Sequence, residues 1–79
     1  MTQEVSLAGL RPGERARVRR MELRGGMRRR LRDMGMLEGA QLRCLLESPG
    51  GDPKAFLLRG AVIALRASDS ERITVEPYA

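Results

Sequence analysis

The chain has no histidine, no tryptophan and a single cysteine, Cys44, among its 79 residues. A structural zinc site needs four ligands drawn from Cys and His, so one cysteine is too few to form one. Fe(II) sites commonly combine histidine with carboxylates, and the histidine is missing. One cysteine cannot form a disulfide within the chain, which fits a reducing, cytoplasmic compartment. The sequence therefore predicts no metal site and no bound cofactor.

Aromatic residues and long apolar runs are also scarce. Phe56 and Tyr78 are the only aromatic residues, which argues against a sheet that stacks the bases of single-stranded nucleic acid. No segment approaches the ~18 continuous apolar residues of a membrane span, so we expect no direct membrane insertion. The first residues lack the apolar core of a signal peptide. At this length the chain is expected to form one domain, residues 1–79.

Catalytic motifs are absent as well. No nucleophile is paired with a base, and the pairs Gly25-Gly26 and Gly50-Gly51 do not belong to a phosphate-binding GxxxxGK[ST] loop. Asp69 and Glu71 could hold a cation weakly at the surface, and a helix-capping role explains them equally well. The sequence therefore predicts no catalytic residues and no enzyme activity.

What the chain has in excess is arginine in its first half. Residues 11–32 contain ten arginines and two glutamates, a net charge of +8, whereas residues 33–79 have a net charge of −2 and the whole chain one of +5. One interpretation is that the first half meets an anionic partner. The other is that the arginines form an ordinary solvated surface. The sequence leaves both open.

Alternation and helical spacing predict the main elements. Ala16 and Val18 share one face of a half-buried strand, and arginines occupy the other face. Met27, Leu31 and Met34 form one apolar stripe of a helix. This helix should end at Gly35 in the left-handed conformation.

Further strands follow the helix. In residues 40–47 the alternating residues Ala40, Leu42, Cys44 and Leu46 are expected to share a buried face. Gly60 indicates a tight turn between two more strands, and residues 73–76 form the last one. Ser68 is expected to cap a short helical turn, with Glu71 three positions later. The pattern predicts a mainly β fold, a small five-stranded barrel with one inserted helix and a short helical turn.

Candidate partner-binding residues lie on and beyond the helix. Arg28, Arg29 and Arg32 are off the apolar stripe and should face water. Met36 and Leu37 come after the stripe, so we expect both to be exposed, and methionine is frequent at adaptable binding surfaces. Leu57 alternates with two inward residues and is expected to point outward.

Several segments keep an order and spacing that resemble a known family. They are Ser6–Glu14, Arg29–Gly39, Gly51–Pro53, Arg59–Gly60, Ala64–Arg66 and Ile73–Val75. Together they resemble the FeoA family over residues 6–76, although Glu38 stands where that family usually has proline.

The resemblance implies a small SH3-like barrel with a helical insert. It also implies a cytosolic accessory protein that binds and modulates FeoB, the membrane GTPase that carries Fe(II). FeoA-like domains also occur in metal-dependent repressors, where they mediate contacts between domains or subunits, so a homo-oligomer stays open. Nucleic acid binding is the alternative that the arginines suggest. The lack of aromatic residues and of a recognition helix argues against it.

Overall fold

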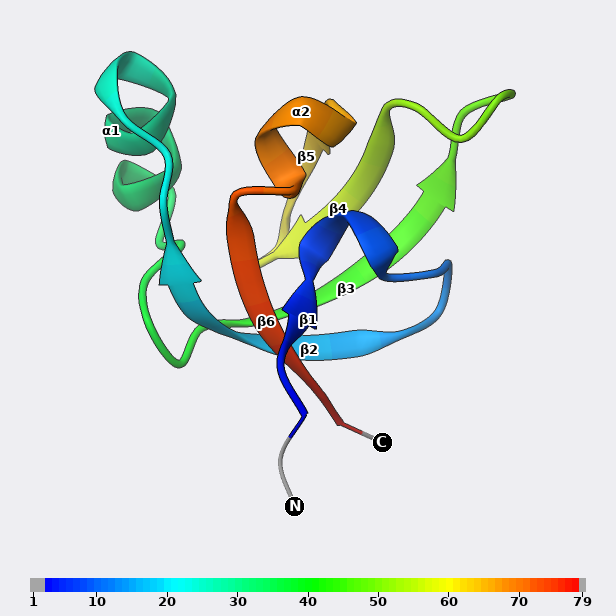
Figure 1. Cartoon of the computed structure of the whole chain (residues 1–79), viewed down its shortest axis with the longest axis horizontal. Helices are drawn as coiled ribbons and strands as arrows, with labels where there is room; N and C mark the ends of the chain where they lie inside the picture. The colour runs from blue at the N-terminus through cyan, green and yellow to red at the C-terminus, as the bar shows by residue number, and fades with distance from the viewer. Residues whose placement is uncertain (1–2, 79) are drawn as a thin grey trace.

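One antiparallel sheet curls around a single core in the computed structural model, which describes residues 3–78 (Figure 1). The strand order in the sheet is β1-β6-β2-β3-β4-β5. The elements are β1 (Val5–Ser6), the 3-10 turn η1 (Leu7–Gly9), β2 (Arg15–Met21), α1 (Gly25–Asp33), β3 (Gln41–Glu47), β4 (Lys54–Leu58), β5 (Ala61–Leu65), α2 (Ala67–Ser70) and β6 (Ile73–Tyr78). The mainly β class with one inserted helix and a short helical turn is confirmed.

Two details of the sheet differ from the expected closed five-stranded barrel. The described chain has a sixth strand, the two-residue β1, which pairs with β6 through Val5 and Val75. No ladder joins β1 to β5 among residues 3–78, so these two strands are the edges of an open, curled sheet. Two residues are too few for an alternating pattern, and this is why the sequence does not reveal β1.

The basic strand β2 has the predicted arrangement. Ala16 and Val18 are buried, whereas Arg15 is exposed. The strand lies between β6 and β3, and its register on β6 shifts between Val18 and Arg20. Because the buried face packs on the core, the arginines of β2 form part of the outer surface of the sheet.

The helix α1 packs through the predicted stripe. Leu31 is buried, and Met27 and Met34 are partly buried against the core. Gly35 ends the helix with a φ of 98°, a left-handed conformation that glycine adopts without steric cost. The amide of Gly35 donates to the carbonyl of Arg32 at 2.9 Å, and the amide of Met36 donates to that of Leu31 at 2.9 Å. These two bonds form a Schellman motif.

The expectation that Met36 is exposed is wrong. Its side chain is 1% exposed and belongs to the core cluster, whereas Leu37 is 49% exposed. A Schellman motif turns the chain back so that the second residue after the cap packs on the last turn of the helix. Met36 occupies that position and lies against the turn that contains Leu31. The helical period ends at Gly35, so it could not predict whether Met36 is buried or exposed.

Leu46 is a second correction. It is 54% exposed instead of sharing the buried face of Leu42 and Cys44. The register of β3 on β4 shifts between Cys44 and Leu46, because Cys44 pairs with Phe56 and Leu46 pairs with Ala55. A bulge adds one residue to one strand and moves the following side chains to the other face.

The β4–β5 hairpin has the predicted tight turn. Leu58 pairs with Ala61, and the two residues between them, Arg59 and Gly60, have φ angles of 52° and 83°. Two central residues with positive φ are typical of a type I′ turn. The Arg59 side chain also lies over Gly35, where an added Cβ would be 2.5 Å from the Arg59 Cδ. This contact joins the hairpin to the end of α1.

The start of α2 is also different from the prediction. Arg66, not Ser68, is the N-cap residue, and no side chain of its own caps the helix. Instead, a carboxylate oxygen of Asp52 accepts a hydrogen bond from the Ala67 amide at 2.9 Å. The helix is therefore capped by a side chain from a distant loop and not by Ser68, the residue that the local sequence predicts.

Candidate functional site

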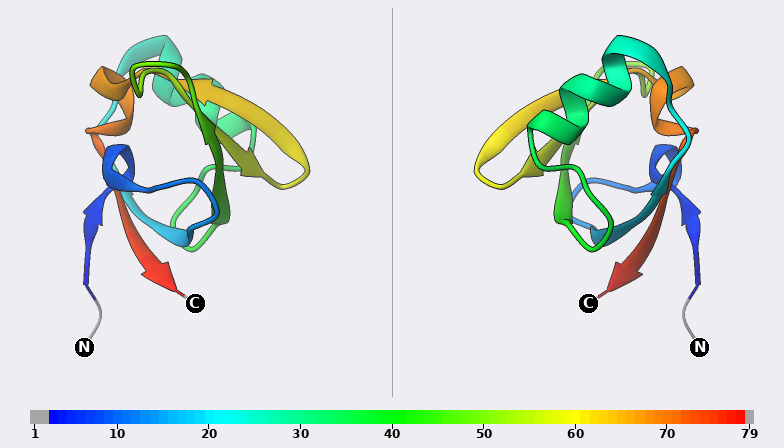
Figure 2. Two further views of the ribbon diagram at one scale, coloured as in Figure 1. Left: turned by 90° about the vertical axis from the view of Figure 1, so that its right-hand side faces the viewer. Right: turned by 90° about the vertical axis from the view of Figure 1, so that its left-hand side faces the viewer.

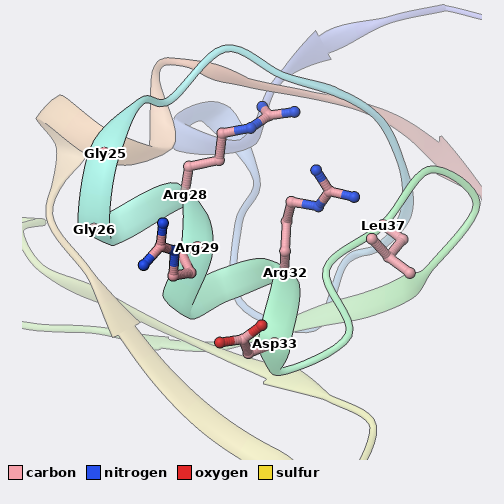
Figure 3. Close-up of a pocket in the computed structure, with 7 residues that line it drawn as sticks. All are labelled: Gly25, Gly26, Arg28, Arg29, Arg32, Asp33 and Leu37. Carbon is pink, nitrogen blue, oxygen red and sulfur yellow. The ribbon is translucent and has the colours of Figure 1, made fainter.

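Four of the six predicted partner-binding residues line one surface hollow (Figure 3). The hollow has a volume of about 740 Å³. Its lining residues are Gly25, Gly26, Arg28, Arg29, Arg32, Asp33 and Leu37. We call Arg28, Arg29, Arg32 and Leu37 the α1 surface. The three arginines come from α1, and Leu37 comes from the loop that follows the helix.

Arg28 is the fixed member of the α1 surface. Its Nη1 donates a hydrogen bond to the carbonyl of Met21, at the end of β2, at 2.7 Å. The side chains of Arg28 and Arg32 extend in the same direction, and Arg29 projects on the other side (Figure 3). Arg29 and Arg32 are both exposed. One guanidinium is thus held by the sheet, and two are free to meet a partner.

The basic surface continues from α1 onto β2. A second, smaller hollow of about 220 Å³ shares Arg28, Arg32 and Leu37 with the first. It adds Arg19 and Arg20 from β2. Those two arginines pair with Glu4 at 3.8 and 2.9 Å, whereas no carboxylate within residues 3–78 lies in salt-bridge distance of the α1 surface arginines. The arginines of the α1 surface therefore form no ion pair within the described part of the chain.

The structure separates the remaining two candidates from this surface. Met36 lines the second hollow but is buried in the core, so it offers almost no surface to a partner. Leu57 is half-buried on the outer face of the sheet, in a different hollow of about 280 Å³ beside Arg15, Arg43 and Tyr78. The sequence-based set therefore divides into one contiguous exposed surface, the buried Met36 next to it, and Leu57 on another part of the sheet.

The arginines that sequence reasoning missed are Arg19 and Arg20. Alternation assigns them to β2 without showing that the end of this strand lies next to α1. Their proximity follows from the chain folding back after Met21, which the Arg28 hydrogen bond fixes. No spacing rule shows that the end of a strand lies beside the helix that follows it, so only the fold reveals this part of the surface.

Metal-ligating side chains do not converge in residues 3–78. This part of the chain has no group of three or more Cys, Asp or Glu side chains that could hold a metal ion. Asp69 lies inside α2, and its amide donates to the carbonyl of Arg66 at 3.0 Å. Cys44 is completely buried. Burial raises the pKa of the Cys44 thiol. The positive charge of Lys54 opposes this effect in part, and the carboxylates of Glu47 and Glu14 add to it, so the thiol is neutral near pH 7.

The buried thiol predicts a pH dependence of stability. The folded chain keeps the Cys44 proton to a pH above the ordinary value of 9.0, whereas the unfolded chain releases it there. The free energy of unfolding should therefore fall as pH rises above this value, by up to about 1.4 kcal/mol per pH unit. Urea unfolding of the parent and of Cys44→Ala at several pH values measures the effect. Parallel pH profiles for the two proteins would contradict it.

Comparison with known proteins identifies close relatives of the whole fold. A family model described as the FeoA domain matches residues 5–77. No curated protein sequence matches significantly. Neither helix of the described chain has the length and apolar character needed to cross a bilayer.

Three solved structures illustrate the similarity. The FeoA protein of Chlorobium tepidum is 36% identical with a TM-score of 0.89, covering 95% of this chain and 71% of that chain. A FeoA-like protein of Clostridium acetobutylicum is 30% identical with a TM-score of 0.85, covering 100% and 92%. The FeoA of Stenotrophomonas maltophilia, a zinc complex described as an SH3 domain protein, is 29% identical with a TM-score of 0.77, covering 90% and 88%.

Proposed function

The chain belongs to the FeoA family, whose members are SH3-like proteins implicated in ferrous iron transport, and we propose that it is a cytoplasmic accessory protein of the FeoB membrane GTPase. In this proposal it is not an enzyme. It binds the cytoplasmic GTPase domain of the transporter and biases that domain between its states. A regulator can do so only through a difference in its affinity for those states.

The observation that supports a protein contact is the α1 surface. It combines three arginines that have no carboxylate partner within residues 3–78 with an exposed leucine at the edge of the same hollow. An apolar side chain beside a group of arginines suits an acidic protein surface that has an apolar residue at its border. The arginines would accelerate and orient association, and Leu37 would be desolvated in the complex.

Metal binding does not enter this proposal. The Stenotrophomonas maltophilia relative is a zinc complex and is described as a candidate ferrous iron transport activating factor. Residues 3–78 of the present chain have no group of three or more Cys, Asp or Glu side chains that could hold a metal ion, and the whole chain has no histidine. Fe(II) is in this view the cargo of the partner, and no step of the proposed mechanism depends on a metal held by this chain.

Calorimetric titration into the purified GTPase domain of the transporter tests the proposal. The titration is run without nucleotide, with GDP and with a non-hydrolysable GTP analogue. We expect binding with different affinities in these states. Equal affinity in all three would eliminate the modulating role, and no binding in any of them would eliminate the partner.

Nucleic acid is the second candidate, because the arginines of α1 and of the end of β2 form one continuous basic surface. Contacts to phosphates alone give binding that weakens steeply with salt. A gel shift that persists at physiological salt, together with no binding to the GTPase domain, would favour this candidate over the transporter.

A further inference from the structure

The outer face of strands β3 to β5 carries an apolar patch that the proposed function does not use. The ladders align Leu46 with Ala55 and Ala55 with Ala64. The neighbouring row aligns Leu57 with Val62. We call these five residues the β5 patch. The four residues on β4 and β5 alternate with the buried Phe56, Leu58 and Ile63, and Leu46 lies opposite Ala55 after the register shift in β3. All five side chains therefore lie on the face of the sheet that points away from the core.

The largest side chains of the β5 patch are well exposed. Val62 is 64% exposed and Leu46 is 54% exposed, and Leu37 on the α1 surface is the third large apolar residue of this kind in the described chain. The patch lies on the β4–β5 hairpin, which projects from the body of the molecule, and on the adjoining part of β3 (Figure 2). The patch therefore lies on a protruding part of the molecule, and its member Leu57 also lines the hollow beside Arg15 and Arg43.

The charged residues that continue the outer face around the patch are arginines. In the sheet register, Arg43 of β3 lies opposite Leu57 of β4. Arg15 of β2 lies opposite Arg43 on its other side. Arg66 follows β5 directly, and all three arginines are exposed. The nearby acidic residues are placed differently. Glu47 lies opposite Lys54 in the sheet register, on the other face from Leu46. Asp52 accepts the hydrogen bond of the Ala67 amide.

We propose that the β5 patch docks the protein onto the surface of an anionic lipid bilayer. Leu46 and Val62 enter the boundary between headgroups and acyl chains, and the three arginines contact lipid phosphates. Shallow apolar penetration combined with cationic side chains is the usual basis of reversible binding to a bilayer surface. A protein of this kind lies on the membrane and does not span it.

Two other occupants fit the patch less well. A second copy would bring the arginines around one patch against those around the other, which costs energy because like charges repel. A specific protein partner is usually oriented by polar groups within its binding surface, and the five side chains of the patch offer no hydrogen-bond donor or acceptor. An anionic bilayer attracts the arginines instead of repelling them. Because it is fluid, it also needs no polar groups in the patch to fix the orientation of the protein.

Vesicle flotation tests this proposal without the transporter, so its outcome is separate from that of the proposed function. The protein is mixed with vesicles of phosphatidylglycerol and phosphatidylcholine in equal amounts, or of phosphatidylcholine alone. We expect binding to the anionic vesicles and little to the neutral ones. The double variant Leu46→Ser/Val62→Ser should reduce the partition coefficient by about tenfold or more. Arg43→Gln/Arg66→Gln should reduce it by about fivefold for each charge removed.

Leu37→Ser is the matched control, since Leu37 is similarly exposed but lies on the α1 surface. It should float with the anionic vesicles as the parent does. No flotation of the parent, an unchanged partition of Leu46→Ser/Val62→Ser, or an equal loss with Leu37→Ser would each overturn the proposal. Loss of binding to the GTPase domain by Leu46→Ser/Val62→Ser, with vesicle binding retained, would instead identify the patch as a protein contact.

Discussion

Reversal of three charges, Arg28→Glu, Arg29→Glu and Arg32→Glu together, is expected to weaken binding to the GTPase domain of the transporter by on the order of a hundredfold at low salt. The change places glutamates where the partner surface is proposed to be acidic, and juxtaposed like charges cost several kcal/mol. Most of the loss should be in the association rate, and it should shrink as salt rises because exposed charges are screened. Stopped-flow association measured at several salt concentrations checks both effects.

A variant with the same total charge provides the control. Arg11, Arg43 and Arg72 are exposed and lie outside the α1 surface, so their joint replacement by glutamate changes the net charge equally at other positions. This control should retain most of the association rate. If both triple variants lose binding to the same extent, the net charge and not the α1 surface governs association. Circular dichroism should show that both remain folded, although Arg28→Glu also removes the hydrogen bond to Met21.

Truncation of a single side chain after α1 should have a large effect on stability. Met36→Ala is expected to lower the free energy of unfolding by about 2–5 kcal/mol, because the buried methionine leaves a cavity between the end of the helix and the core. That is a large fraction of the total for a domain whose net stability is about 5–15 kcal/mol. Urea unfolding followed by circular dichroism measures the change.

The adjacent residue is the matched control. Leu37→Ala should change the free energy of unfolding by no more than about 0.5 kcal/mol, because half of this side chain is already in water. The same substitution should weaken binding to the GTPase domain, whereas conservative replacement Met36→Leu should not. Equal destabilisation by Met36→Ala and Leu37→Ala would contradict the Schellman geometry at the end of α1.

Sequence reasoning was accurate where a regular period continues through an element. The alternation of β2 placed Ala16 and Val18 in the core, and the stripe of α1 placed Leu31 there. Gly35 was predicted in the left-handed conformation and Gly60 in a tight turn, and both have a positive φ, which glycine tolerates. These are local properties of the backbone, so the local sequence is sufficient to specify them.

The errors occur where the period is interrupted or where distant segments meet. Leu46 follows a bulge in β3, and no residue type in this strand indicates that a bulge is present. Met36 follows a helix end whose return direction depends on the hydrogen bonds of the cap. The cap of α2 comes from Asp52, fifteen residues away. The α1 surface could be predicted as a set of exposed arginines, but its continuation to Arg19 and Arg20 depends on tertiary contacts.

The position of β6 in the sheet has a consequence for the order of folding. This strand lies between β1 and β2, so residues from the two ends of the described chain form neighbouring ladders. A nascent chain that still lacks residues 73–78 has an unpaired edge on β2 and no partner for β1. Such non-local pairing carries a high entropic cost of loop closure and makes folding slow. The fold can therefore be completed only after synthesis of its last strand, and until then the unpaired edge of β2 is open to chaperones or to other chains.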